Sequence, residues 1–450
     1  MASFKEIFII NKLFCLIFPI FQFLVSAVIS LVKIAGVRWL FFWSLSLVKM
    51  EYAYGAKCGY YCYTNKKIDS ARARIKYLEE FLAYISYNYI GCSHAEEKNE
   101  SRSLIVASSL SLVGGHTRII KYYLENLSDV KLYLSGDIRN GKNKREKKLF
   151  VKLVARILDN NSKLANIADI TSSDSEDIIR KHLENISLLR PRNIIIFNAG
   201  SDIYLLMALL VYKKLEPDVK FIYYHHGDDY LQIFDGYFDI HVDIDYNQEI
   251  KCRNIENRKL IRIATEDRKA FSKEKKKSFN VFSFVPFYKI NHSSSEDCFA
   301  SLIELLVIQG CKVFFANNFD HDLLHAHLLE KKISNNNIKI ITDCYDLKHF
   351  SLGIDVYIDT FPIGGGYTLI EAMSMAVPIV IYDSKHHQVF KDPVLNHFKF
   401  NSLDEVKIYI TRLKEDKIFH KQESDAAYNI YLKYFGVEKM VKTLSLLIDN

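Results

Sequence analysis

The sequence lacks the features that define small secreted, zinc-bound or repetitive proteins. Its eight cysteines are scattered over 450 residues, and the one close pair, Cys58 and Cys62, has no second pair or nearby histidine to complete a zinc site. The chain also contains no low-complexity tract and no repeat of solenoid period. These absences exclude a disulfide framework and a repeat array, and they indicate reduced thiols in a cytoplasmic compartment.

The sequence also has only a small excess of positive over negative charge. The formal net charge is +7, which is too small to argue for nucleic-acid binding but suits anionic ligands such as phosphates or an acidic membrane face. Basic residues gather in 139–148 and 268–277, and we interpret both stretches as solvated loops.

The amino end carries the one long apolar run. Residues 13–32 contain no charge and are numerous enough to span a bilayer, and both tryptophans of the chain follow within 39–48. We therefore predict that 1–50 associate with the membrane, either spanning it or lying on its surface. A pair of buried helices is the alternative. The predicted location is cytoplasmic, at the inner face of the cell membrane.

The remainder of the chain alternates between two patterns. Short apolar runs, typical of buried strands, are separated by helical periodicities, and this alternation predicts parallel sheets covered by helices on both faces. The predicted fold class is α/β, with two tandem doubly wound Rossmann-like domains behind a hydrophobic helical N-terminal segment. The predicted divisions are a helical region over 51–100, domains over 101–270 and 278–402, and C-terminal helices over 403–450.

A glycine-rich stretch, "DTFPIGGGYTLIEA" at 359–372, joins a predicted strand to a predicted helix. Ligands of doubly wound folds bind beyond the carboxyl ends of the strands, and Gly364, Gly365 and Gly366 would let a ligand approach the backbone there. The start of the helix favours a diphosphate. Thr368 could add a hydroxyl donor, and Glu371 could bind the two hydroxyls of a ribose or sugar. Alternatively, Glu371 only complements the helix dipole.

This stretch, with Asp359 and Pro362 before the glycines, resembles the nucleotide-sugar loop of GT-B glycosyltransferases. The likeness is strongest to bacterial enzymes related to the O-GlcNAc transferase and HMW1C-like group. Group 1 (family 4) sugar transferases are also similar, but the first of their two usual glutamates falls here on Ile363, which counts against a retaining mechanism of that type. The stretches 114–118 and 223–245 extend the resemblance.

The resemblance implies a nucleotide-sugar donor, no cofactor and no metal. Lys289 could stabilise the diphosphate, since basic residues hold this position in related transferases; the alternative is an ordinary loop lysine. Asn317, at the end of a predicted strand, could contact the base or the sugar. Gly114 and Gly115 would face the acceptor. The other predicted donor-binding residues are Asp359, Pro362, Gly364, Gly365, Gly366, Tyr367, Thr368 and Glu371. The predicted catalytic base is His226, with Asp228 and His116 as further candidates, because these polar residues follow predicted strands and loops at strand ends face the cleft.

The function that these residues imply is transfer of a sugar from a nucleotide diphosphate, most readily UDP, to a glycan or lipid-linked acceptor in surface polysaccharide or lipopolysaccharide synthesis. A protein glycosyltransferase of the HMW1C-like type and a nucleotide-sugar epimerase of the same fold are alternatives. A dinucleotide-dependent oxidoreductase would use Asp137 as its ribose ligand, but no G-x-G-x-x-G opens either helix. The non-enzymatic alternative is a membrane-bound partner of a polysaccharide assembly complex.

Overall fold

The computed structural model describes most of the chain after residue 102. The expectations for 1–50 and 51–100 lie outside the described residues. The described residues are 103–108, 110, 115–135, 164–167, 175–197, 202–225, 235–244, 257–269, 278–290, 299–317, 321–330, 337–342, 353–361, 363–383 and 392–449.

The first body is a seven-stranded sheet in which every pair of neighbours is parallel. Its strand order is β3-β2-β1-β4-β5-β6-β7, so consecutive strands run outward from β1 on one side and from β4 on the other. The elements are β1 (Ser103–Ala107), α4 (Gly115–Asn126), β2 (Val130–Leu134), β3 (Leu164–Ile167), α6 (Ser175–Leu189), β4 (Asn193–Phe197), α7 (Ile203–Leu215), β5 (Lys220–His225), η1 (Asp235–Tyr237), β6 (Ile240–Asp243) and β7 (Arg258–Leu260).

The central strands form where the sequence is continuously apolar. Every residue of β1 (SLIVA) and of β4 (NIIIF) is buried, because helices cover both faces of a doubly wound sheet. Ala107 at the end of β1 pairs with Leu134 of β2 and with Phe197 of β4. These three strands therefore end level, and the segments that follow them start at one edge of the sheet.

The second body is a six-stranded parallel sheet with the order β10-β9-β8-β11-β12-β13. Its strand order reverses between β8 and β11, as that of the first sheet reverses between β1 and β4. The elements are β8 (Asn280–Phe284), α9 (Phe287–Ile290), α10 (Phe299–Ile308), β9 (Lys312–Ala316), α11 (His321–Glu330), β10 (Ile338–Ile341), β11 (Val356–Ile358), α12 (Gly366–Ser374), β12 (Ile379–Tyr382), η5 (Pro393–Phe398) and β13 (Lys399–Phe400).

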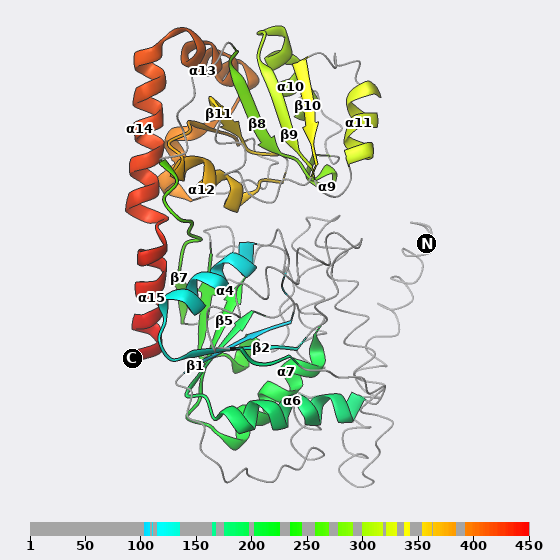
Figure 1. The fold of residues 1–450 in the computed structure, drawn as a ribbon, viewed down its shortest axis with the longest axis vertical. Helices are drawn as coiled ribbons and strands as arrows, with labels where there is room; N and C mark the ends of the chain where they lie inside the picture. The colour runs from blue at the N-terminus through cyan, green and yellow to red at the C-terminus, as the bar shows by residue number, and fades with distance from the viewer. Residues whose placement is uncertain are drawn as a thin grey trace, which may run out of the picture.

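Three helices close the chain: α13 (Leu403–Glu415), α14 (Lys417–Tyr434) and α15 (Val437–Asp449). Figure 1 shows α14 running along the second body and α15 continuing down the first. Helix α14 contacts α12, whereas α15 contacts α4. The Lys220 ammonium on β5 donates to the carbonyl of Leu447 at 3.1 Å. The C-terminal helices therefore pack against both bodies.

In the residues that the structure describes, the chain passes between the two bodies at two places, and these touch. Thr265, in the segment after β7, forms a parallel β-bridge with Gly436 between α14 and α15, and its N–H donates to the carbonyl of Phe435 at 3.1 Å. A cavity of about 710 Å³ lies beside this crossing, and Tyr122 and Tyr431 are among the residues that line it.

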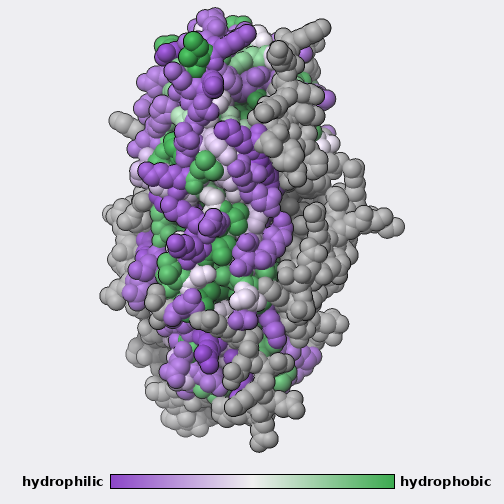
Figure 2. Space-filling model, turned by 60° about the vertical axis from the view of Figure 1, so that its left-hand side comes forward, coloured by the Kyte–Doolittle hydropathy of each residue, from purple (hydrophilic) through white to green (hydrophobic). Residues whose placement is uncertain are grey.

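The outer face of α14 and α15 comes to the front in Figure 2, where hydrophilic side chains are mixed with hydrophobic ones. Ile418, Leu432 and Leu446 are exposed hydrophobic side chains on these two helices. Single exposed apolar residues are ordinary on protein surfaces. In the part of the chain that the structure describes, no helix combines the length and the hydropathy that a bilayer crossing requires.

The structure confirms the α/β class and two parallel Rossmann-like sheets. The carboxyl ends of β8 and β11 flank the point where the strand order of the second sheet reverses, and open α/β sheets bind ligands at such points. The stretch 359–372 follows β11, and Lys289 follows β8. The predicted donor-binding residues therefore follow the two strands that flank this switch point.

Candidate functional site

The glycine loop is built around a buried aspartate. The N–H of Gly365 donates to both carboxylate oxygens of Asp359, at 2.9 and 3.1 Å, and the Lys289 ammonium donates to the carbonyl of Gly364 at 3.0 Å. A Cβ on Gly365 would lie 3.3 Å from Nζ of Lys289 and 3.4 Å from Oδ1 of Asp359. Because the φ of Gly365 is −119°, an ordinary extended value, close approach rather than backbone strain explains the glycine.

Asp359 is only 1% exposed. Burial raises the pKa of Asp359 from 3.8 to about 7, and the nearby Lys289 ammonium and the N–H groups of Gly365 and Thr360 oppose this rise. The group therefore changes its charge near neutral pH, directly beneath the loop that we expect to receive a diphosphate.

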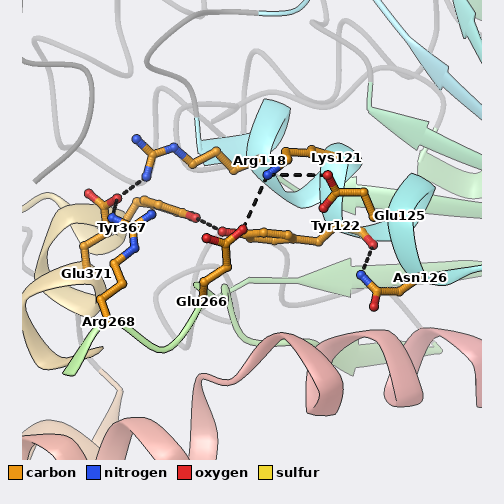
Figure 3. A network of polar contacts seen from close by, with 9 residues as sticks. All are labelled: Arg118, Lys121, Tyr122, Glu125, Asn126, Glu266, Arg268, Tyr367 and Glu371. Atoms are coloured by element: carbon orange, nitrogen blue, oxygen red, sulfur yellow. Dashed lines mark hydrogen bonds and ion pairs between the residues drawn. The ribbon is translucent and has the colours of Figure 1, made fainter. Parts of the chain in front are cut away.

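Helix α12 begins at Gly366 and carries Glu371 one turn in. Glu371 is 3% exposed, and its Oε1 accepts from two guanidinium groups. One belongs to Arg118 on α4, in the first body. The other belongs to Arg268, in the segment after β7, at 2.8 Å. Figure 3 shows both arginines pointing at this carboxylate from different elements.

The starts of α4 and α12 lie against each other. The Arg118 guanidinium is 4.7 Å from the centre of the Tyr367 ring, and the hydroxyls of Tyr122 and Tyr367 are 3.4 Å apart (Figure 3). A Cβ on Gly115 would lie 3.3 Å from the Tyr367 ring. Gly115, which we predicted to face the acceptor, thus gives the ring of a predicted donor-binding residue the room to approach. The first turns of α4 and α12 therefore meet across the interface between the bodies.

Carboxylates near this cluster have partners of their own. Glu266 lies 3.4 Å from the Lys121 ammonium, which also contacts Glu125 on the same helix. Asp267 accepts from the Tyr428 hydroxyl at 2.6 Å. Beside the Glu371 cluster, the connecting segment is therefore tied to α4 through Glu266 and to α14 through Asp267.

The other predicted residues are placed as follows. Asn317 is fully buried at the end of β9, and its side chain donates to the carbonyl of Val285 at 2.8 Å, which joins the ends of β8 and β9. Thr368 hydrogen-bonds to the phenol of Tyr357 beneath the helix. His116 is half-buried in the first turn of α4. Four residues lie outside the described ranges: Gly114, Pro362, His226 and Asp228.

Sequence reasoning missed the two arginines. Arg118 is the last residue of the stretch 114–118 (GGHTR), and its position four residues after Gly114 places it on the first turns of a helix that follows a glycine pair. Arg268 opens the basic stretch 268–277, which we interpreted as a solvated loop. That interpretation is wrong for Arg268, because its side chain is 5% exposed and its N–H donates to the carbonyl of Ser374 at 3.1 Å.

In the described ranges, no three histidine, cysteine, aspartate or glutamate side chains are grouped so that they could hold a metal ion. Asp243, part of the acidic "DID" stretch at 243–245, accepts from Nε of Arg258 at 2.8 Å. The positive charge described around the glycine loop comes from Lys289, Arg118 and Arg268.

Sequence comparisons find no relatives, whereas structural comparisons find many. No family model matches the chain, and no curated protein matches its sequence. A glycosyltransferase from Rickettsia africae has a similar structure, with a TM-score of 0.59 at 12% identity over 78% of this chain and 98% of that one. Anabaena HepE, in complex with UDP and glucose, gives a TM-score of 0.56 at 12% identity over 78% and 100%.

An O-GlcNAc transferase mutant from Thermobaculum terrenum gives a TM-score of 0.55 at 11% identity, over 89% of this chain and 76% of that one. The chain has the GT-B glycosyltransferase fold. The resemblance that the glycine loop predicted is thereby confirmed at the level of the fold.

Proposed function

We propose that this protein is a glycosyltransferase that transfers a sugar from a UDP-sugar to a glycan or lipid-linked acceptor in surface polysaccharide or lipopolysaccharide synthesis. The observation that carries the proposal is the arrangement at the β8–β11 switch point. There the glycine loop, the N-terminus of α12 and the ammonium of Lys289 come together, with Nζ 3.0 Å from the carbonyl of Gly364. Backbone N–H groups and a cation at one place suit a leaving diphosphate.

In the proposed complex, Lys289 and the loop Gly364–Gly366 bind the diphosphate, with Tyr367 and Thr368 at the start of the helix. Glu371 binds the ribose hydroxyls, and Asn317 lies beneath the base or the sugar. Asp359 fixes the loop through the N–H of Gly365. The acceptor hydroxyl approaches from the side of Gly115 and loses its proton to His226, with Asp228 and His116 as the further candidates.

The choice of UDP rests on the likeness to HepE, which was solved with UDP and glucose. The hydrophobic residues 13–32 support a lipid-linked acceptor, because attachment to the cytoplasmic face of the membrane would bring the enzyme to its substrate. Cell fractionation of the full-length chain and of a chain without residues 1–50 tests that attachment. A membrane fraction without the full-length chain would contradict it.

Ligand-induced stabilisation of the full-length protein tests the donor site. UDP, GDP, CMP and dTDP are added at increasing concentration while thermal unfolding is followed. A ligand at about one hundred times its Kd adds about 2.7 kcal/mol to the free energy of unfolding. We expect UDP to raise the melting temperature most. The proposal fails if none of the four nucleotides raises the melting temperature of a folded sample.

Two variants connect that result to the loop. Lys289→Gln removes the cation, and we expect it to weaken UDP binding about tenfold or more, since a hydrogen bond to a charged group contributes about 1.5–3 kcal/mol. Lys312→Gln is the matched control, because Lys312 is exposed at the start of β9, at the opposite edge of the same sheet. Equal UDP affinity in the two variants would remove Lys289 from the site.

Turnover separates transfer from the alternative reaction of the same fold. A glycosyltransferase releases UDP from UDP-sugar only in step with the appearance of sugar on an acceptor, supplied here as lipid extract or protein. A nucleotide-sugar epimerase changes the UDP-sugar without any acceptor. The likeness to the O-GlcNAc transferase structure makes protein the second acceptor class to assay. Activity retained in EDTA is expected, since Lys289 and the helix N-terminus are proposed to stabilise the leaving diphosphate.

A further inference from the structure

Two arginines hold the carboxylate that the proposed function assigns to the donor's ribose. Arg118 and Arg268 both donate through Nη1 to the same oxygen, Oε1 of Glu371. Two guanidiniums and one carboxylate together carry one net positive charge, and Glu371 and Arg268 are 3% and 5% exposed. A buried ion triad of this kind is costly to desolvate, so its value to stability alone is a weak explanation.

The triad is also a contact between the two bodies. Arg268 moves with the second body, because its N–H donates to the carbonyl of Ser374 at the end of α12. Arg118 belongs to α4 of the first body, and its guanidinium lies over the Tyr367 ring at the start of α12. The two cations therefore approach Glu371 from opposite sides of the interface, one turn from the glycine loop (Figure 3).

Donor binding changes the partners that these groups need. If the ribose hydroxyls donate hydrogen bonds to Glu371, they compete with the two guanidiniums for its carboxylate oxygens. A guanidinium that loses its anion in a site without water is unfavourable. A diphosphate replaces that anion, because a guanidinium fork matches two phosphate oxygens at once. The exchange leaves every charged group with a partner in both states.

We propose that Arg118 and Arg268 are donor-binding residues that exchange Glu371 for the diphosphate of the nucleotide when the donor enters. This inference rests on the proposed function, since it takes a nucleoside diphosphate as the ligand. Arg118 reaches the ligand from the first body, so the interface between the two sheets contributes directly to the donor site. In the absence of a donor, the same arginines keep the carboxylate covered.

Calorimetric titration of the full-length protein with uridine, UMP and UDP isolates the phosphate contribution. The ratio of UDP to uridine affinity is measured for the wild type, Arg118→Gln and Arg268→Gln. We expect each variant to lower that ratio about tenfold or more, with uridine affinity equal to or above that of the wild type, because Glu371 loses one of the guanidiniums that cover it. Arg412→Gln is the control. Arg412 lies 3.9 Å from the centre of the Phe419 ring, so it resembles Arg118 in charge and ring contact but belongs to α13.

Each outcome decides one of the two proposals. A wild-type ratio in both glutamine variants would overturn the exchange, and so would tighter UDP binding by either variant, since the arginines would then act only as a barrier. If the wild type binds neither uridine nor UDP, the proposed function fails, and the exchange fails with it. Where a glutamine variant does not fold, Arg118→Lys or Arg268→Lys replaces it. Lysine keeps the charge without the fork, so an intermediate ratio supports the exchange and a wild-type ratio contradicts it.

Discussion

The buried carboxyl of Asp359 makes the stability of this protein depend on pH in an unusual direction. Its pKa is raised from 3.8 to about 7 by burial. The folded state therefore holds a proton on Asp359 that the unfolded chain has released, between about pH 4 and pH 7. Stability then falls as the pH rises through this interval, and the loss is complete above the folded-state pKa. Most buried aspartates that are paired with cations behave in the opposite way.

The magnitude follows from the two pKa values. One pKa unit corresponds to about 1.36 kcal/mol, so the shift from 3.8 to about 7 amounts to about 4 kcal/mol in total, of which about 3 kcal/mol falls between pH 5 and pH 8. Asp359→Asn removes the titrating group, and its side-chain oxygen can still accept from the N–H of Gly365. The variant is expected to keep its stability over this interval while the wild type loses about 3 kcal/mol relative to it.

Urea denaturation of both proteins at pH 5 and pH 8 measures this difference. The quantity compared is the change in unfolding free energy between the two pH values, so each protein serves as its own reference. Asp404→Asn, at an exposed carboxyl in the first turn of α13, controls for the loss of a surface carboxyl group. Equal pH dependence in the wild type and Asp359→Asn would refute the reasoning, because the titrating group would then lie elsewhere.

Three further substitutions test the site and one helix. Gly115→Val would displace the ring of Tyr367, so UDP affinity should fall about tenfold by calorimetry, whereas Gly236→Ala, whose methyl meets nothing within 4 Å, should bind UDP normally. Glu371→Gln should reduce the preference for UDP over 2′-deoxy-UDP about tenfold in the same assay, and an unchanged preference would remove the ribose from Glu371. Asp416→Ala removes the N-cap of α14, which accepts from two N–H groups at 2.9 Å, and should cost about 1 kcal/mol in urea denaturation.

The fold could be predicted from the sequence to the extent that burial leaves a local pattern. The strands β1 and β4 are continuously apolar because both of their faces are covered, and the sequence marks them clearly. The edge strands β3 (LANI) and β7 (RKL) cannot be recognised in this way, since an edge strand with short or polar side chains has no continuous apolar run. Helix α11 (HDLLHAHLLE) has no single apolar face in its sequence, because Leu324 and Leu328 are buried whereas Leu323 and Leu329 are exposed.

The residues of the candidate site also fall into those that a local sequence pattern marks and those that it does not. The loop at Gly364–Gly366 and Lys289 could be predicted because a strand, a glycine run and a helix are adjacent in sequence. The contact of Arg118 with Glu371 joins residues 253 positions apart and depends on how the two bodies meet. Nothing in the sequence around either residue specifies that meeting. Local chemistry could therefore be predicted from sequence, whereas the pairing across the interface required the structure.

The bridge between Thr265 and Gly436 has a mechanical consequence. In the described part of the chain, both segments that connect the two bodies pass through this one point and are hydrogen-bonded to each other there. A rotation of one body against the other would pivot there, with the neighbouring cavity giving the side chains room to reorient. Arg268 follows Thr265 by three residues and shares Glu371 with Arg118, so such a rotation would change the ion pair between Arg118 and Glu371 right beside the crossing.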